Sequence, residues 1–260
     1  ILRKVGGLGR INPKAKGILE KPHRAMFTDI AVVGAGLSGL SAALSAAGQG
    51  AEVTLIDKLE HLGGNNKDLL EEELVKEIIT NKSITIITGA PAFGFYPPNL
   101  ITLDTTEEMI KLHCEKIIIA TGSHEVPIIF ENNDLPGIML ASGAIKLLKL
   151  YGAIPGNDAV IITEGNDGYS QALELKNCGL NVVAILDSRT GIESQVLEPL
   201  ERAEIPVFTG VKSIKAIGSD SIRSIKFQYG DNWYYLDCDL ACSSGRLQPS
   251  LQLALQAGCS

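Results

Sequence analysis

Several features that mark whole classes of protein are missing from this sequence of 260 residues. Its longest apolar runs, such as 117–120, have the length of strands, whereas a membrane-spanning helix needs roughly 20 apolar residues. The first residues, Ile1 to Lys4, form no apolar signal core and include no initiator methionine. Acidic residues outnumber basic ones, 30 to 23, and the basic ones are scattered, whereas nucleic acids and anionic membranes favour clustered basic residues. We therefore expect a cytoplasmic protein with no membrane span and no nucleic-acid partner.

The sequence is also poor in the cysteine patterns that support redox or metal chemistry. It has five cysteines and no C-x-x-C pair, which is the motif of redox-active disulfides. Cys238 and Cys242 lie four positions apart, with neither a second pair nor a histidine nearby, so the ligand spacing of a zinc site is missing. We expect no bound metal, and reduced thiols that pack as small apolar side chains.

Two stretches of the chain carry the strand–helix–strand pattern of a nucleotide-binding unit. The first runs from the apolar segment 30–33, through a helix marked by Leu37, Leu40 and Leu44, to a strand at 53–57. The second has strands at 159–163 and 181–187 on either side of a helix at 167–178. This repetition predicts an α/β fold with two Rossmann-like domains. The other expected elements are helices at 68–79 and 142–151, strands at 83–87 and 116–120, an antiparallel hairpin or small sheet within 93–116 and a meander within 206–236.

A glycine loop joins the first strand to the first helix and reads Gly34-Ala35-Gly36-Leu37-Ser38-Gly39. In this context Gly34 permits a tight turn, Gly36 lets the backbone approach a pyrophosphate, and Gly39 allows close contact between helix and strand. The pyrophosphate then lies on free N–H groups at the N-terminus of the helix. Asp57, followed by Lys58, ends the next strand about 20 residues later, where such folds place the acid that binds a ribose. The loop therefore predicts a site for an adenine dinucleotide.

Two further segments of small residues are expected beside this loop. Gly63, Gly64 and Asn65 follow shortly after the ribose acid, and their small size would let the chain pass over the adenosine and pyrophosphate. Ala120, Thr121 and Gly122 end a buried strand, and the carboxyl ends of parallel strands face the ligand crevice. We expect both segments to line the same dinucleotide site.

The corresponding loop of the second unit departs from this pattern. It reads Thr163-Glu164-Gly165-Asn166-Asp167-Gly168, so a threonine stands in the place of the first glycine. Glu164 and Asp167 bring negative charge to the helix N-terminus, where that charge opposes a phosphate. One hypothesis is a second nucleotide site formed by Thr163, Gly165, Gly168 and, as a ribose acid, Asp187. The favoured alternative is a degenerate domain that is kept for packing or for subunit contact.

These features, in this order, resemble the flavoproteins with two dinucleotide-binding domains, the pyridine nucleotide-disulfide oxidoreductase-like proteins. The resemblance covers 29–260 and includes the segment 244–249, which is similar to the stretch where the chain of that family returns to its first domain. More specific segments, at 120–130, 133–141 and 151–156, are similar to the alpha subunit of heterotetrameric sarcosine oxidase and to subunits of dye-linked proline dehydrogenase and opine oxidase.

The resemblance implies a Rossmann-like FAD-binding domain with an inserted second Rossmann-like domain of the NAD(P)-binding type. We expect an irregular N-terminal arm at 1–24, the FAD-binding domain at 25–135 plus 236–260, and the inserted domain at 136–235. The resemblance also implies FAD in the first site, with NAD or ATP as alternatives there, and NAD(P) as the ligand of the second site. The family's Gly-Asp, which contacts the flavin side of FAD, is not found after Gly258, so we expect that part of the FAD-binding domain to be incomplete here.

Three functional hypotheses follow from these patterns. The leading one is an FAD-dependent oxidoreductase subunit of an amine or amino-acid oxidase or dehydrogenase complex, whose partner subunit carries the flavin that oxidises the substrate. The second is a non-catalytic scaffold subunit that binds NAD or ATP. The third, an NAD(P)H-dependent flavin reductase, is disfavoured because redox cysteines are missing. No nucleophile and base can be paired from their spacing, so we name no catalytic residue, and any redox chemistry would belong to the cofactor.

Overall fold

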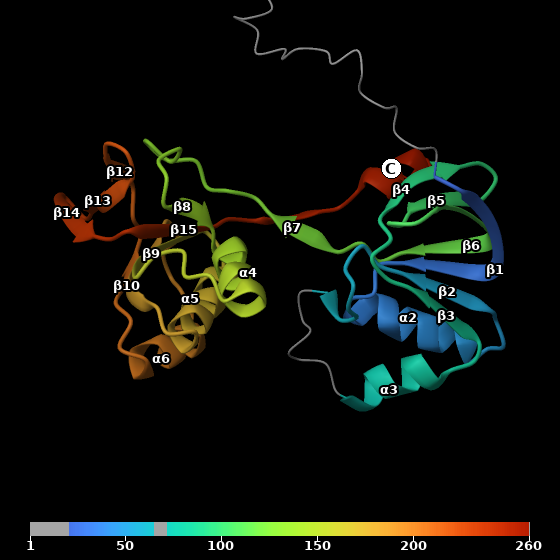
Figure 1. The fold of residues 1–260 in the computed structure, drawn as a ribbon. Coiled ribbons are helices and arrows are strands. Elements are labelled where there is room, and N and C mark those ends of the chain that lie inside the picture. Colours follow the sequence, from blue (N-terminus) through green and yellow to red (C-terminus); the bar gives the residue numbers. More distant parts are fainter. Residues whose placement is uncertain (1–20, 65–71, 260) are drawn as a thin grey trace, which may run out of the picture. The chain divides into compact units, whose positions relative to one another are not determined.

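The computed structural model describes residues 21–64 and 72–259, and they divide into two compact units (Figure 1). The first unit holds the described residues up to Gly122 together with those from Ser250 onward, and the second unit is the continuous segment Ser123–Pro249. Among the described residues, no helix is long and apolar enough to cross a membrane. The fold is a mixed α/β arrangement in which each unit has its own sheet.

The sheet of the first unit has six strands in the order β3-β2-β1-β6-β5-β4. β1 (His23–Val33), β2 (Val53–Ile56), β3 (Ile84–Ile87) and β6 (Met109–Ile119) run parallel, and β5 (Leu100–Asp104) and β4 (Ala92–Tyr96) add an antiparallel edge. α2 (Leu37–Ala47) and α3 (Glu72–Thr80) cover one face of this sheet (Figure 1). The short α7 (Gln252–Gln256) contacts β4.

Side chains that point alternately to the two faces of the central strands divide the core of the first unit into two layers. Val32 and Leu55 pack with Leu40 and Ala43 of α2, because successive side chains of a strand point to opposite faces of the sheet. Val33 and Ile56 instead face a second cluster, which includes Leu253 of α7. The carboxyl ends of β1 and β2 are therefore held from both faces, and the glycine loop begins at that rigid edge.

Some predicted boundaries in the first unit were wrong. His23 and Arg24, assigned to the irregular arm, already belong to β1 and pair with Met109 and Ile110, whereas residues 1–20 lie outside the described part. The hairpin and the strand expected at 116–120 share one continuous strand, β6, because it pairs with β1 along one edge and with β5 along the other. The first residues of the helix expected at 68–79 lie outside the described part, and α3 ends at Thr80.

The sheet of the second unit has five parallel strands in the order β11-β10-β9-β15-β8. Helices pack on one face, and a three-stranded antiparallel sheet packs on the other. β9 supplies both layers, because Ile161 faces the helices and Ile162 faces the small sheet. The strands of the main sheet are β8 (Ile138–Leu140), β9 (Asp158–Thr163), β10 (Asn181–Asp187), β11 (Val207–Thr209) and β15 (Leu240–Ser244). The helices are α4 (Ala141–Tyr151), α5 (Asp167–Asn177) and α6 (Ser194–Arg202). The small sheet consists of β12 (Ile214–Gly218), β13 (Ile222–Tyr229) and β14 (Asn232–Asp237).

The second unit extends further along the chain at both ends than the inserted domain expected at 136–235. β7 (Ser123–Glu125) pairs with β16 (Leu247–Pro249), and β15 lies in the middle of the second sheet, between β9 and β8. Residues 123–135 and 236–249 therefore pack with the second unit, because their strands and apolar side chains complete its sheet and core.

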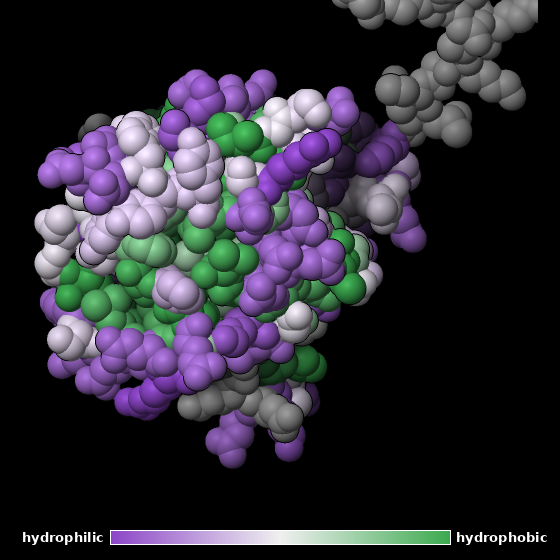
Figure 2. All heavy atoms as spheres, turned by 90° about the vertical axis from the view of Figure 1, so that its left-hand side faces the viewer, coloured by the Kyte–Doolittle hydropathy of each residue, from purple (hydrophilic) through white to green (hydrophobic). Residues whose placement is uncertain are grey.

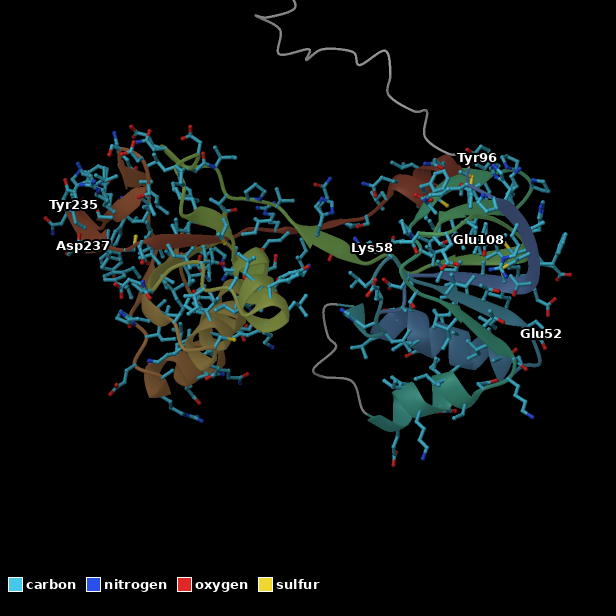
Figure 3. The ribbon with its side chains drawn as sticks, viewed as in Figure 1. Glu52, Lys58, Tyr96, Glu108, Tyr235 and Asp237 are labelled. Carbon is cyan, nitrogen blue, oxygen red and sulfur yellow. The ribbon has the colours of Figure 1, made fainter. Side chains whose placement is uncertain are left out.

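The small sheet leaves aromatic residues at the surface of the second unit. Trp233 and Tyr235 are 49% and 61% exposed, and the Lys226 ammonium lies over their rings, 4.6 Å and 5.5 Å from the centroids. Tyr235 and Asp237 of β14 are labelled in Figure 3. In the view of Figure 2, hydrophobic residues gather in the middle of the face shown and hydrophilic residues border them. The rings of Trp233 and Tyr235 are surface side chains rather than core, because about half or more of each residue is exposed.

Candidate dinucleotide site

The candidate site begins where β1 ends, at Gly34. Its N–H donates to the Ile56 carbonyl oxygen of β2 at 2.8 Å, and its φ of +107° lies in the region that favours glycine. A Cβ at this position would lie 2.2 Å from the Ala120 carbonyl oxygen. Gly34 therefore turns the chain in a space that no other residue fits.

Gly36 and Gly39 differ in what surrounds them. A Cβ on Gly39 would lie 1.8 Å from the Gly34 carbonyl oxygen, so this glycine is required for α2 to approach the loop. A Cβ on Gly36 would meet no atom within 4 Å, and its φ of −73° suits any residue. The fold therefore does not need a glycine at Gly36, and the open space beside it is available to a ligand.

The N-terminus of α2 is suited to an anion. No side chain caps it, and its first turn carries no acidic residue. Leu37 and Ser38 are exposed there. The first N–H groups of a helix have no partner within the helix, and its dipole favours negative charge at that end. Such a terminus, with open space beside Gly36, has the donors and the room that a diphosphate requires.

Asp57 fixes the other side of the loop. Its Oδ2 accepts the Ala35 N–H at 2.6 Å and its Oδ1 accepts the Leu59 N–H at 2.8 Å. Both donors are backbone groups, and a carboxylate has about four lone-pair positions, so each oxygen can still accept another hydrogen bond. Lys58, labelled in Figure 3, is exposed next to it. This carboxylate is therefore held in place with acceptor positions that remain free.

The glycines after Asp57 lie on the loop. The Gly63 N–H donates to the Ala35 carbonyl oxygen at 2.8 Å, and Gly63 pairs with Gly36 as a parallel bridge. Gly63 and Gly64 both have positive φ, +100° and +58°. The structure thus brings Gly63 and Gly64 against Gly36, while the predicted Asn65 lies outside the described residues.

The segment after β6 closes the third side. The Ala120 N–H donates to the Val33 carbonyl oxygen at 2.8 Å, which places Ala120 beside Gly34. The Thr121 hydroxyl donates to the Ser250 carbonyl oxygen at 2.8 Å, and the Ser250 N–H donates to the Gly122 carbonyl oxygen at 2.9 Å. The predicted hydroxyl therefore holds the C-terminal segment, and no motif in the sequence identified Ser250 as its partner.

The second loop has a different interior. The Thr163 hydroxyl donates to the Gly165 carbonyl oxygen at 2.8 Å and accepts the Gly165 N–H at 3.1 Å. A Cβ on Gly168 would lie 2.3 Å from the Thr163 Oγ1. Thr163 thus fills the space between strand and helix and draws the loop back onto itself.

Asp187 is fully buried, whereas the buried Asp57 keeps 8% of its surface exposed. The Tyr169 hydroxyl donates to its Oδ2 at 2.6 Å, and Arg189 Nη2 lies 2.7 Å from the same oxygen. Thr163, Gly165, Gly168 and Asp187 do lie together at the carboxyl ends of β9 and β10, but Arg189 and Tyr169, which no sequence motif identified, occupy the carboxylate.

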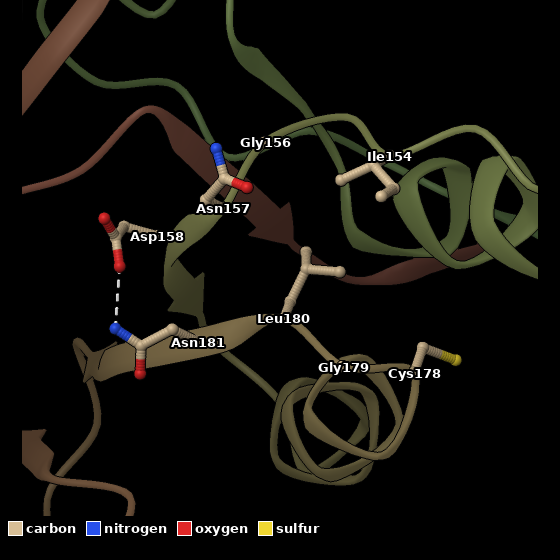
Figure 4. Close-up of a pocket in the computed structure, with 8 residues that line it drawn as sticks. All are labelled: Ile154, Gly156, Asn157, Asp158, Cys178, Gly179, Leu180 and Asn181. Atoms are coloured by element: carbon tan, nitrogen blue, oxygen red, sulfur yellow. Dashed lines mark hydrogen bonds between the residues drawn. The ribbon is translucent and has the colours of Figure 1, made fainter.

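A separate pocket lies at the opposite ends of these strands. It is lined by residues that precede or begin β9 and β10, among them Asn157, Asp158 and Asn181 (Figure 4). The Asn181 Nδ2 donates to Asp158 Oδ1 at 2.7 Å. Because Thr163 and Asp187 lie at the other ends of the same strands, this pocket is separate from the loop of the second unit.

Comparisons with known proteins agree with this architecture. The family described as pyridine nucleotide-disulphide oxidoreductase matches residues 28–259. The alpha subunit of sarcosine oxidase from Corynebacterium sp. (strain P-1) is 32% identical over 231 residues, which are 78% of this chain and 24% of that protein. An opine oxidase polypeptide of Agrobacterium tumefaciens (strain Ach5), named as one of that enzyme's subunits, is 23% identical, over 90% of this chain and 55% of its own length.

Solved structures share the fold. L-proline dehydrogenase from P. horikoshii has a TM-score of 0.66 at 22% identity and covers 92% of this chain and 46% of its own. Thioredoxin reductase from T. acidophilum has a TM-score of 0.70 at 18% identity, with coverages of 88% and 80%. The predicted pair of Rossmann-like domains is therefore confirmed, and the matched family supports binding of FAD or NAD(P). The chain spans about a quarter of the length of the sarcosine oxidase polypeptides that it matches.

Proposed function

We propose that this chain, which belongs to the pyridine nucleotide-disulphide oxidoreductase family, is the FAD-binding part of an oxidoreductase subunit. The complex that we propose oxidises or dehydrogenates amines or amino acids. Relatives named as subunits of sarcosine oxidase and of opine oxidase support this class of complex. Because these relatives are subunits by name, they also support a partner subunit. We propose that this partner oxidises the substrate at its own flavin.

The arrangement around Gly36 carries this proposal. The open side of this glycine, the uncapped N-terminus of α2 and the fixed carboxylate of Asp57 form three neighbouring parts of one loop. They fit a diphosphate flanked by a ribose, which every adenine dinucleotide contains. The diphosphate would accept N–H groups of the first turn of α2, and a ribose hydroxyl would donate to Asp57.

The residues of this chain bind and orient the cofactor. FAD, when bound, would supply the redox chemistry. Gly63 and Gly64 would cover the diphosphate from the side of β2, and Ala120 would limit the site beside Gly34. None of the residues that line the loop is a cysteine, so no thiol relay is part of the proposal. We also propose that the protein acts in the cytoplasm.

A second candidate is a scaffold subunit that binds NAD or ATP at the same loop and does no chemistry. One observation favours it: the three parts of the loop fit a diphosphate and a ribose, which an adenosine diphosphate already contains. The two candidates differ in whether a flavin follows the diphosphate.

The loop assignment is tested by the matched substitutions Gly36→Ala and Gly165→Ala. Both glycines have open space where a Cβ would be placed, so each variant should keep its free energy of unfolding within about 0.5 kcal/mol. Gly36→Ala should weaken FAD binding by at least about tenfold, which is about 1.4 kcal/mol, because its methyl group enters the space of the diphosphate. Gly165→Ala should bind FAD as the unchanged protein does. Equal FAD affinity of both variants, measured by flavin fluorescence quenching, would refute the assignment.

A further inference from the structure

We propose that Arg189 closes the second unit to pyridine nucleotides by occupying Asp187, the carboxylate that would bind a nucleotide ribose. The family implies an NAD(P) site in this unit, and the residues present do not fit it. This inference is independent of which nucleotide the first loop holds.

The hydrogen-bonding capacity of Asp187 is fully used. Its Oδ1 accepts the Arg189 backbone N–H at 2.7 Å, and its Oδ2 accepts Arg189 Nη2 at 2.7 Å and the Tyr169 hydroxyl at 2.6 Å. Arg189 Nε lies 3.2 Å from both oxygens. A carboxylate offers about four acceptor positions, so no position is left for a pair of ribose hydroxyls.

The charge of Asp187 is also neutralised. Arg189 forms an ion pair with it, and the carboxylate side chain is fully buried. Hydrogen bonding to Asp187 raises the pKa of the Arg189 guanidinium above its already high value, so the guanidinium is charged at neutral pH. Asp57, whose donors are only backbone N–H groups, has no such partner among the described residues.

Two further contacts hold the guanidinium over the loop. Arg189 Nη1 donates to Asn166 Oδ1 at 3.1 Å, at the residue that precedes α5. Its guanidinium carbon lies 5.9 Å from the centroid of the Tyr169 ring, within the range of a cation–π contact. Arg189 therefore connects the end of β10 to the start of α5, across the place where a nucleotide would enter.

The loop itself excludes a diphosphate for a separate reason. Thr163 pulls Gly165 inward through two hydrogen bonds. Glu164 and Asp167 are exposed at the N-terminus of α5, so negative charge stands where phosphate would lie. The first loop has neither a side chain in this position nor an acid in its helical turn. Closure at the ribose and repulsion at the phosphate thus act on the two halves of the same ligand.

The experiment counts nucleotide sites on the whole chain. The purified protein, with its first-loop nucleotide retained or restored to saturation, is titrated separately with NADH and with NADPH in equilibrium dialysis. The expected result is no additional nucleotide bound per chain for either ligand at concentrations up to about 1 mM, a weak limit that corresponds to about −4.1 kcal/mol. This result needs no variant and does not depend on whether the first loop holds FAD, NAD or ATP.

Variants separate the ways in which the inference can fail. One additional NADH per chain that is lost in Asp187→Asn, but kept in Asp57→Asn, would show an open ribose site and overturn it. Binding of one additional NADPH per chain would also overturn it if that binding is lost in Arg189→Ala. Such a result would mean that Arg189 moves away from Asp187 and binds the 2′-phosphate of NADPH itself. Far-ultraviolet circular dichroism of each variant shows whether the variant is folded, and so distinguishes a loss of nucleotide binding from a loss of folding.

Discussion

Asp57 and Asp187 end equivalent strands of the two units, yet their carboxylates have different partners. Asp57 accepts hydrogen bonds from two backbone N–H groups, whereas Asp187 accepts them from a guanidinium and a phenol. The difference follows from residues next to the motif rather than within it, because Arg189 and Tyr169 are not part of any nucleotide-binding pattern. The aspartate of the first unit thus keeps free acceptor positions, whereas the aspartate of the second unit is used internally.

Tyr169→Phe tests the internal role of Asp187 by its pH dependence. Burial, and then the neighbouring Asp187, raise the pKa of the Tyr169 hydroxyl above its ordinary value of about 10. A raised pKa contributes stability that is complete below pH about 10 and is lost as the pH rises through the value in the folded protein. At pH 7 the variant should lose about 2 kcal/mol of unfolding free energy, the value of a hydrogen bond to a charged group.

The measurement is urea unfolding of the unchanged protein and of Tyr169→Phe between pH 7 and pH 11. The difference between their unfolding free energies should stay constant to about pH 10 and shrink above it. A difference that does not change with pH would mean that the Tyr169 hydroxyl is not coupled to Asp187.

Each βαβ element depends on one close approach between helix and strand, and a pair of glycines tests it. Gly39→Ala would place a methyl group 1.8 Å from the Gly34 backbone oxygen, so it should destabilise the protein by about 3 kcal/mol. Gly168→Ala would place its methyl group 2.3 Å from Thr163 Oγ1 and 2.5 Å from Thr163 Cβ. Rotation of the threonine side chain cannot move that Cβ, so the cost of this variant should also be about 3 kcal/mol. Chemical unfolding measures both variants, and a cost well below about 1 kcal/mol for Gly39→Ala would show that the helix α2 does not need its contact with the loop.

Most elements were predictable because their apolar spacing is regular. β10 was predicted at 181–187 and is found there, and α5 and β9 differ from the prediction by one residue at one end. α6 was missed, although Val196, Leu197 and Leu200 pack on the core, because Pro199 lies inside the helix and proline normally interrupts one. β6 was predicted as separate elements, since only the tertiary partners β1 and β5 show that it is one strand.

The candidate site was also predictable only in part. The glycines of the first loop could be located because backbone geometry demands them, as the positions of Gly34 and Gly39 illustrate. Ser250 could not be located, because its backbone contacts with Thr121 and Gly122 join residues far apart in the chain. The state of Asp187 could not be foreseen either, since the strand-end acid looks the same in sequence whether or not an arginine turns back to it.

For the whole molecule, the resemblance to pyridine nucleotide-disulfide oxidoreductase-like flavoproteins is confirmed. The two units have different roles in the function that we propose. The first presents an open glycine loop to a dinucleotide, and the second keeps the fold of a nucleotide-binding domain with its acid satisfied internally. Electrons would then reach a flavin in the first unit from a partner subunit rather than from NAD(P)H bound by this chain.

The most direct test of the proposed function is the identity of the nucleotide that the purified chain carries. The protein is denatured, and the released small molecules are separated by chromatography and identified by their absorbance spectra. We expect FAD at about one molecule per chain, with no pyridine nucleotide beside it. NAD or ATP in its place, or a chain that stays colourless after incubation with FAD, would contradict the flavoprotein assignment and leave the scaffold function in its place.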